Sequence, residues 1–278
     1  MKNKAILKEN LIFRSKTDKI ENISYIFMMG VCTVTKAQEY LKNLIDIIER
    51  ISGDQGDNIE TAARLMSDTL CGGGRVHAFG TGHSHMLAEE LFYRAGGLVN
   101  VDPMLETSLM LHESASKSTE LERLEGYGEI LFEHFGVKKG DMLFLFSNSG
   151  RNGVAIDLAI KARGCGIPTV AITNMSHTLS GSSRHSSGKK LYQLADIVVD
   201  NCGCVGDASM VFDGFDKKVA PTSTSAGAAI LNAIEARAVE LMLERGVEPE
   251  VFASSNVDGG DEINAAYVKK YAKEIRSL

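Results

Sequence analysis

The sequence predicts an α/β fold built on a parallel β-sheet, and three features of the chain indicate it. Residues 142–146 form a short apolar run bounded by turn residues, which is typical of a strand buried on both faces. A polar turn, apolar residues at helical spacing over 154–162 and a second apolar run over 167–173 follow. Residues 75–97 repeat the order of strand, glycine-rich turn and helix. Such successive units join parallel strands by right-handed crossovers.

Two amphipathic helices are predicted before the first strand. Residues 36–51 and 59–70 each place apolar side chains on one face, and glycines at 72–74 end the second helix. We expect the two helices to form a helical hairpin. The N-terminal residues show only weak periodicity, so we predict a poorly ordered extension over residues 1–33 and a single domain over 34–278.

The segments on either side of the central strand are assigned from the same patterns. Strands are predicted at 98–101 and 195–199, and a helix is predicted at 127–135. The Ser- and Glu-rich segment 102–125 is long for a connection, which favours a lid or a subunit contact. The segment 174–188 is rich in Ser, Gly and His and is expected to be a loop.

The C-terminal part is predicted to be mainly helical. Residues 201–220 are expected to be irregular. Pro221 and the hydroxyl groups of residues 222–225 predict the start of a long helix, which Gly246 ends. A terminal helix is predicted to end near Ile275.

The composition excludes several classes of function. The chain has 278 residues, a net charge of −6 and only 6% aromatic residues. An acidic chain without a Lys/Arg cluster argues against a nucleic-acid partner. No apolar run approaches the ~20 residues of a membrane helix, and no small-x-small cleavage site follows the apolar residues 25–34. We therefore predict a cytoplasmic protein without a membrane partner, and a start nearer Met28 is the alternative for its N-terminus.

Cysteines and glycines narrow the possible cofactors. The five cysteines are irregularly spaced, which is typical of reduced thiols. Cys202 and Cys204 could hold a metal but lack a second ligand pair, so buried thiols are favoured. Glycines at 80 and 82 let a ligand approach the backbone. A dinucleotide fingerprint fails because its third glycine would fall at His85, and no Gly-Lys-Ser/Thr sequence follows either turn.

At these residues the sequence resembles the sugar isomerase (SIS) domain family, over roughly residues 36–246. Five motifs in the family's order carry the resemblance: FGTGHS (79–84), FSNSGRNG (146–153), GIPTVAIT (166–173), LADIVVD (194–200) and PTSTSAG (221–227). The resemblance implies a flavodoxin-like three-layer αβα sandwich with a five-stranded parallel sheet, plus an N-terminal helical hairpin and a C-terminal helix. It also implies a phosphosugar ligand, and a homodimer or homotetramer with sites near subunit interfaces. Phosphoheptose isomerase-like members and a group of uncharacterised SIS proteins are the most similar.

The resemblance implies that both turns and the start of the last domain helix bind the ligand. A phosphate dianion needs several neutral donors, and the helix start adds free backbone N–H groups and the positive end of its dipole. Asn152 stands where Ser or Thr is common in the family, and its amide keeps a donor. The candidate phosphate- and substrate-binding residues are Gly82, Ser84, Ser147, Asn148, Ser149, Asn152, Thr222, Ser223 and Thr224.

The candidate base lies in the helix after the first turn. Isomerisation needs a base that moves a proton between C1 and C2, and an acid for the oxygens. Phosphoheptose isomerases carry the base in an Ala-Glu-Glu-Leu run. Here the run is 88–91, and Glu90 takes the matching position, about one helical turn earlier after the serine. The partner histidine of those enzymes lies on the last domain helix, and residues 226–245 contain none.

Histidines elsewhere supply the acid candidates. His83 and His85 are favoured because imidazole titrates near neutral pH, whereas His112 is expected to be an exposed surface residue. With Glu89, the first two could instead form a zinc site. The main interpretation requires no metal and no cofactor. It is a sugar-phosphate isomerase, and the alternatives are an amino-sugar-phosphate lyase or etherase and a non-catalytic phosphosugar sensor.

Overall fold

The computed structural model describes residues 34–278. The chain divides into two units, residues 1–41 and 42–278. Of the first unit, the described part contains the beginning of helix α2 (Lys36–Asp54), which continues into the second unit. The predicted extension over 1–33 lies outside the described residues, so the predicted domain boundary stays a prediction.

The second unit contains a five-stranded parallel sheet in the order β2-β1-β3-β4-β5. This is the order of a flavodoxin-like sheet, in which the strand order reverses between β1 and β3. The predicted fold class is therefore confirmed. The strands are β1 (Val76–Gly80), β2 (Val101–Pro103), β3 (Met142–Phe146), β4 (Thr169–Thr173) and β5 (Ile197–Asp200).

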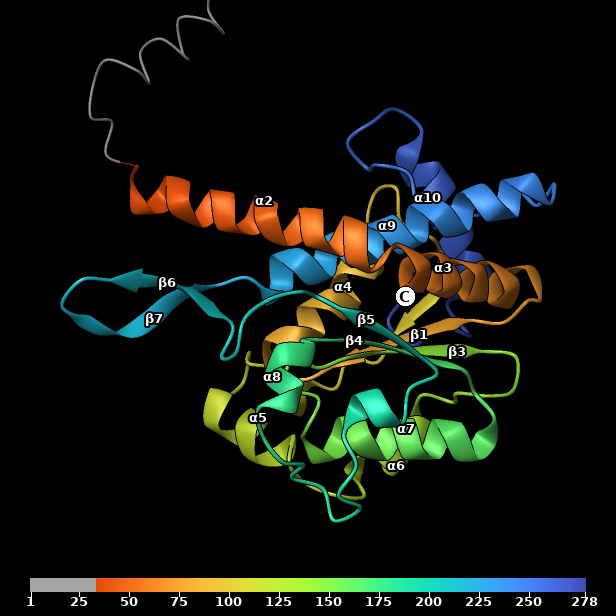
Figure 1. Cartoon of the computed structure of the whole chain (residues 1–278). Helices are drawn as coiled ribbons and strands as arrows, with labels where there is room; N and C mark the ends of the chain where they lie inside the picture. Colours follow the sequence, from red (N-terminus) through yellow and green to blue (C-terminus); the bar gives the residue numbers. More distant parts are fainter. Residues whose placement is uncertain (1–33) are drawn as a thin grey trace, which may run out of the picture. The chain divides into compact units, whose positions relative to one another are not determined.

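Helices cover both faces of the sheet (Figure 1). One face carries α3 (Gly56–Cys71), α4 (Met86–Leu91) and α9 (Ser223–Glu244), and the other carries α6 (Tyr127–His134) and α7 (Gly153–Cys165).

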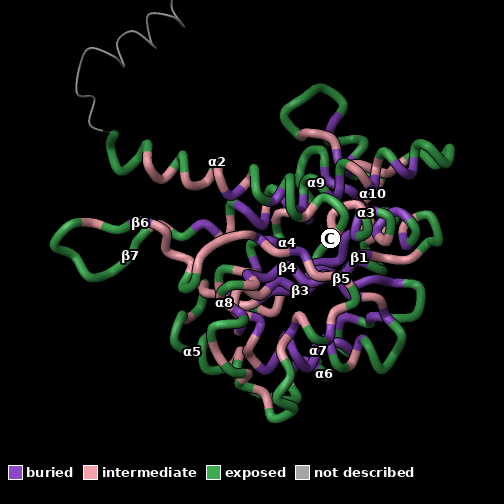
Figure 2. The backbone as a smooth tube through the Cα atoms, viewed as in Figure 1, coloured by how far each residue is buried: buried purple, intermediate pink, exposed green. Residues whose placement is uncertain are grey.

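Side chains along β3 point alternately to the two faces of the sheet and so contribute to two separate cores. Phe144 and Phe146 belong to the core that includes α3 and α9, whereas Leu143 and Leu145 belong to the core that includes α6 and α7. All five residues of β1, of β3 and of β4 are buried, as the purple strands of Figure 2 show. Burial on both faces explains why these strands have no polar alternation in the sequence.

The edge strand β2 is displaced from its predicted position. The prediction of a strand at 98–101 is wrong, because the strand runs from Val101 to Pro103 and Leu98 instead forms an antiparallel bridge with Val251. Pro103 disfavours a central strand in any sequence-based prediction. It is tolerated here because an edge strand does not need every backbone N–H.

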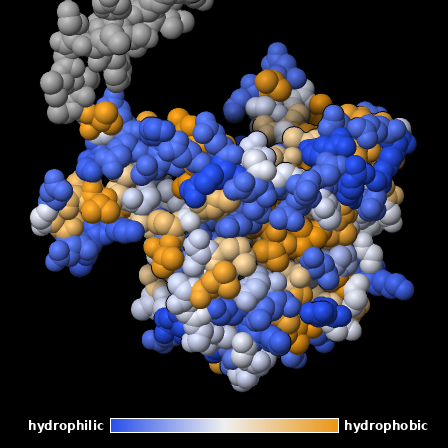
Figure 3. Space-filling model, in the orientation of Figure 1, coloured by the Kyte–Doolittle hydropathy of each residue, from blue (hydrophilic) through white to orange (hydrophobic). Residues whose placement is uncertain are grey.

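An antiparallel hairpin replaces the irregular segment predicted over 201–220. It consists of β6 (Ala208–Phe212) and β7 (Phe215–Pro221). An Asp-Gly turn with Gly214 at φ +71° joins them, which is a common hairpin connection. Exposed apolar side chains gather on the hairpin at the left of Figure 3; they are Val211, Phe215 and Val219.

Short helices occupy the predicted loops. The segment 102–125 contains a 3₁₀ turn (Thr107–Leu109) and α5 (Ala115–Leu121), so a connection without secondary structure is a wrong description of it. Helix α8 (Met175–Leu179) begins the segment after β4, and α10 (Gly260–Tyr271) is the terminal helix. Among residues 34–278, no helix combines the length and apolar character that crossing a membrane requires.

Candidate functional site

A narrow crevice of about 20 Å³ lies at the carboxyl ends of β1 and β3, where the strand order reverses. Its walls come from the turn after β1, the loop after β3, the segment after β5 and the start of α9. The lining residues are Ser84, Leu87, Ser147, Asn148, Ile172, Asn201, Ser223 and Thr224. Five of the nine candidate binding residues are therefore brought together, at the place where open α/β sheets bind ligands.

Hydrogen bonds fix the loop after β3. The Ser147 hydroxyl accepts from the N–H of Gly150 at 3.1 Å. The Asn148 Oδ1 accepts from Asn201 Nδ2 at 2.8 Å, and Asn201 Oδ1 in turn accepts from Asn174 Nδ2 at 2.9 Å. Because Oδ1 of Asn148 is occupied, its Nδ2 is the group left to donate to a ligand.

Four other candidate residues do not line the crevice. Gly82 lies in the turn Gly82–His85, where its carbonyl oxygen contacts the His85 ring. The carbonyl oxygen of Ser149 accepts from Thr178 Oγ1 at 2.6 Å. Asn152 precedes α7 and its Oδ1 accepts from Arg184. Thr222 is buried, and its hydroxyl oxygen has no hydrogen-bond partner.

The N-terminus of α9 is capped by Asp207, which precedes the β6–β7 hairpin. The N–H groups of Thr222 and Ser223 donate to Asp207 Oδ1 at 3.0 and 2.8 Å, and the Ser223 hydroxyl donates to Asp207 Oδ2 at 2.6 Å. The hydroxyl of Thr222 makes no cap bond. The predicted helix start is confirmed, and the acceptor for its free N–H groups is a carboxylate that precedes the hairpin. Asp207 also orients Ser223 at the crevice.

A second cavity of about 570 Å³ borders all three candidate catalytic residues, Glu90, His83 and His85. Glu90 forms an ion pair with Arg94, four residues later and beyond the end of α4. Its Oε1 also accepts from Nδ2 of Asn232 on α9 at 2.9 Å. Helix α9 thus supplies the side-chain amide that donates a hydrogen bond to Glu90.

One set of side chains in this cavity could hold a metal. The ligand atoms of His85, Glu89 and His112 lie within 4.8 Å of one another. His85 is buried, its Nδ1 contacts the carbonyl oxygen of Gly82, and its Nε2 has no hydrogen-bond partner among residues 34–278. Two imidazoles and a carboxylate suit zinc. The sequence predicted a zinc site made of His83, His85 and Glu89. The structure instead groups His85 and Glu89 with His112, so His112 replaces His83 as the third potential ligand.

The cysteine pair gives no comparable set. In the described part of the chain, neither Cys202 nor Cys204 belongs to a group of three potential ligands. Burial raises the pKa of the Cys202 thiol to about 11. A thiol that stays protonated at neutral pH is a poor ligand and nucleophile.

Glu235 on α9 is a buried carboxyl group close to Glu90 and Arg94. Its Oε1 accepts from the N–H of Leu98 at 2.7 Å. Burial raises the pKa of Glu235, Arg94 opposes this shift, and Glu90 adds to it. The helix that lacks the expected histidine therefore carries two polar side chains at this place, Asn232 and Glu235.

Comparison with known proteins agrees with this architecture. Residues 39–174 match the family model of the SIS domain, so the fold and the sequence define a SIS-domain protein. A UPF0309 protein of Geobacillus kaustophilus is 43% identical over 240 residues, which are 86% of this chain and 96% of that protein. One of Oceanobacillus iheyensis is 40% identical over 246 residues, which are 88% of this chain and 100% of that protein. The chain belongs to the UPF0309 family.

A more distant likeness links the chain to solved structures. A phosphoheptose isomerase of Francisella tularensis aligns with 76% of this chain and 100% of its own, at 16% identity and a TM-score of 0.48. The NanR protein of Vibrio vulnificus, in complex with ManNAc-6P, aligns with 92% of this chain and 73% of its own, at 14% identity and a TM-score of 0.40.

Proposed function

We propose that the chain binds a phosphosugar in the crevice and isomerises it between its aldose and ketose forms. The observation that supports the proposal is the convergence of Ser84, Ser147, Asn148, Ser223 and Thr224 at the strand-order reversal. Hydroxyl and amide groups offer several neutral donors to the ligand. The start of α7 adds backbone N–H groups and the positive end of its dipole, which favours a phosphate.

The proposed chemistry is a proton transfer between C1 and C2. Glu90 removes the proton from one carbon and returns it to the other, while His83 or His85 transfers a proton between the two oxygens. Arg94 and Asn232 hold the Glu90 carboxylate. Glu90 follows Ser84 by six residues, so the segment 84–90 runs from the crevice to the cavity that Glu90 borders.

Two alternatives use the same site. An amino-sugar-phosphate lyase or etherase would use the same carboxylate to remove a proton beside a carbonyl. The ion pair between Glu90 and Arg94 favours the third candidate, a sensor, because it engages the carboxylate that would have to take the proton. Turnover of a bound phosphosugar separates the enzymes from the sensor.

A ligand screen tests the proposal. Melting temperatures measured with a panel of sugar phosphates should rise for at least one compound, since a ligand that binds only the folded state stabilises it. Ser147→Ala should reduce this shift, whereas Ser176→Ala on exposed α8 should leave it unchanged. If no sugar phosphate raises the melting temperature, or if Ser147→Ala keeps the full shift, the proposal is wrong.

We also propose that the protein is a homodimer or homotetramer. The exposed Val211, Phe215 and Val219 of the β6–β7 hairpin support this, because burying them in a subunit contact would be favourable. Light scattering should give a mass above that of one chain, and Phe215→Glu should lower it. A monomeric wild-type protein would contradict the proposal.

A further inference from the structure

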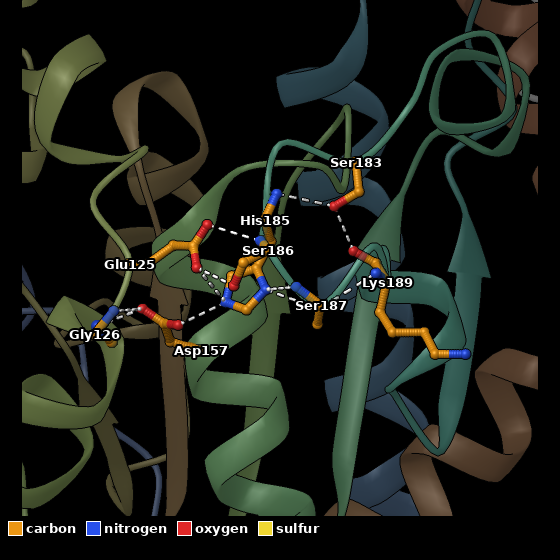
Figure 4. A network of polar contacts seen from close by, with 9 residues as sticks. Glu125, Gly126, Asp157, Ser183, His185, Ser186, Ser187 and Lys189 are labelled. Atoms are coloured by element: carbon orange, nitrogen blue, oxygen red, sulfur yellow. Dashed lines mark hydrogen bonds and ion pairs between the residues drawn. The ribbon is translucent and has the colours of Figure 1, made fainter.

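The cluster around His185 shows a histidine and a carboxylate that are fully hydrogen-bonded (Figure 4). The ring nitrogens of His185 lie 2.9 Å from Asp157 Oδ1 and 2.8 Å from the Ser187 hydroxyl. The other oxygen of Asp157 accepts from the N–H of Gly126 at 2.7 Å. Every side-chain nitrogen and oxygen atom of His185 and Asp157 is engaged, so this cluster has a structural role and offers no free group to a ligand.

The cluster around His77 is bonded less completely. His77 on β1 and Asp102 on β2 are 0% and 1% exposed. His77 Nε2 lies 3.1 Å from Asp141 Oδ2, but its Nδ1 is 3.7 Å from Asp102 Oδ2, which is beyond hydrogen-bond distance. Among residues 34–278, neither His77 Nδ1 nor Asp102 Oδ1 has a hydrogen-bond partner. A buried carboxyl oxygen without a partner is costly, and Asp102 therefore favours a ligand that donates a hydrogen bond to it.

Asp102 borders a cavity of about 670 Å³ near the amino ends of β1 and β3. Its walls come from the residue before β1, the connection between α6 and β3, and the segment after α10. The crevice lies at the opposite end of β1, whose five residues span about 17 Å. The cavity and the crevice are therefore separate. The Lys, Arg, Asp and Glu residues that line the cavity are Arg75, Lys138, Lys273, Arg276, Asp102 and Glu274.

The cavity concentrates positive charge in an acidic chain. The chain has a net charge of −6, yet four of the six Lys, Arg, Asp and Glu residues around the cavity are cations. In the part of the chain that the structure describes, none of these four cations forms an ion pair. Cations around a concave surface raise the local concentration of anions.

Both arginines of the cavity are held by backbone carbonyl groups. Arg75 Nη1 donates to the carbonyl oxygen of Glu274, and Arg276 Nη2 donates to that of His134 at 2.6 Å. The Arg276 guanidinium also lies over the Phe135 ring, 5.7 Å from its centroid. Because a guanidinium has five N–H donors, both arginines are fixed in place and keep donors for an anion.

Both arginines also act on Asp102. Burial raises the pKa of Asp102, and His77, Arg75 and Arg276 oppose this shift. The two arginines therefore lie close enough to Asp102 to influence its charge, which agrees with their common place on the cavity wall. The cavity thus presents cationic donors and one carboxyl acceptor to the same ligand.

We propose that this cavity is a second ligand site, which takes a small polyvalent anion that carries a hydrogen-bond donor. Arg75, Arg276 and Lys138 bind the anionic groups, and Asp102 accepts from the donor. A phosphorylated metabolite with a P–OH or hydroxyl group has this chemistry. The proposal does not depend on which ligand the crevice binds.

Inorganic pyrophosphate is the probe that tests the site, because it is polyvalent and keeps a P–OH group near neutral pH. Calorimetric titration at an ionic strength of about 0.15 M, where charges more than ~8 Å apart are largely screened, should show saturable binding to the wild-type protein. Lys138→Ala should weaken this binding about tenfold, the cost of a lost contact between charged groups. Lys139→Ala is the matched control, because this neighbouring lysine is equally exposed but does not line the cavity.

Ser147→Ala in the crevice separates the two sites and should leave the binding that depends on Lys138 unchanged. No saturable binding to the wild type, equal affinity of the two lysine variants, or loss of pyrophosphate binding in Ser147→Ala instead of Lys138→Ala would each overturn the proposal. None of these outcomes decides whether a sugar phosphate binds in the crevice, which the melting-temperature screen tests.

The role of Asp102 has its own readout. Above neutral pH, inorganic phosphate and sulfate are both divalent and similar in size, but only phosphate keeps a proton that it can donate to Asp102. Measured in Ser147→Ala, phosphate should bind about tenfold more tightly than sulfate, since sulfate would face the carboxyl oxygen without a donor. Equal affinity for the two anions would show that Asp102 does not accept a hydrogen bond from the ligand.

Discussion

Asn232 of α9 donates a hydrogen bond to Glu90 of α4, with 2.9 Å between Nδ2 and Oε1. Asn232 Nδ2 also donates to the carbonyl oxygen of Ala228 at 2.9 Å, which fixes the amide on its own helix. Arg94 donates to the same Glu90 oxygen. The carboxylate that borders the 570 Å³ cavity is therefore oriented by Asn232 on α9 and by Arg94, three residues after the end of α4.

Glu90→Gln should lower kcat by about 10²- to 10⁴-fold if Glu90 is the base, because the amide cannot accept the proton. Binding of the sugar phosphate should change little, since Gln keeps the shape and an oxygen acceptor. Steady-state kinetics measures both. Glu129→Gln on the exposed side of α6 is the control for a surface glutamate. Full turnover in Glu90→Gln would remove Glu90 from the mechanism.

Zinc binding can be measured without any substrate. The set of His85, Glu89 and His112 predicts that the purified protein takes up about one Zn²⁺ or Co²⁺ ion per chain. His85→Ala and His112→Ala should each weaken this binding at least about tenfold, as a lost ligand does. His83→Ala is the control, since this exposed histidine lies outside the set. Equal loss in the control, or no metal uptake by the wild type, would argue against the site.

Gly80→Ala should destabilise the protein by about 1–3 kcal/mol or more. A Cβ at Gly80 would lie 2.4 Å from the carbonyl oxygen of Ser84, so the backbone of the first turn would have to shift. Denaturant unfolding gives the change in free energy of unfolding. Gly53→Ala in α2 meets open space and should stabilise the helix by about 0.5–1 kcal/mol. Similar effects of the two changes would contradict the close approach at Gly80.

Burial of Glu235 predicts a pH-dependent stability. Its folded pKa is raised, so the folded state holds the proton more tightly, and this stabilisation is lost as the pH rises from about 4.5 through the raised pKa. The loss amounts to about 1.4 kcal/mol for each unit of pKa difference. Glu235→Gln keeps an acceptor for the N–H of Leu98 but has no carboxyl group to titrate. The melting temperature of this variant should therefore rise relative to that of the wild type as the pH rises.

Thermal unfolding between pH 4 and 8 measures this effect. Glu248→Gln, on the exposed segment after α9, controls for a simple loss of negative charge. A difference between Glu235→Gln and the wild type that stays constant over this range would show that Glu235 does not titrate as described.

The layers of the fold were predictable because their signals are local. The apolar runs of β3 and β4 are buried on both faces, and a glycine-rich turn marks the end of β1. The β6–β7 hairpin was missed because β7 is exposed along nearly its whole length and backbone pairing supports it without a buried apolar face. The position of β2 was predicted wrongly because Pro103 argues against a strand. The edge strand tolerates this proline, since it pairs with β1 on one side only.

The candidate site was predictable where residues follow a strand directly. Ser147 and Asn148 follow β3, Ser84 lies in the turn after β1, and all three line the crevice. The contacts of His112 with His85 and Glu89, and of Asp207 with the start of α9, were not predicted. Each residue reaches its position through a connection whose path depends on tertiary packing.

The central claim is that the crevice recognises a phosphorylated sugar. Calorimetric titration of the sugar phosphate found in the screen, and of the same sugar without its phosphate, against the wild type and Ser147→Ala tests it most directly. The account predicts saturable binding of the phosphorylated sugar, no measurable binding of the unphosphorylated one, and an affinity at least about tenfold lower in Ser147→Ala, the cost of a lost hydrogen bond to a charged group. Equal affinity for the two sugars, or an unchanged affinity in Ser147→Ala, would contradict it.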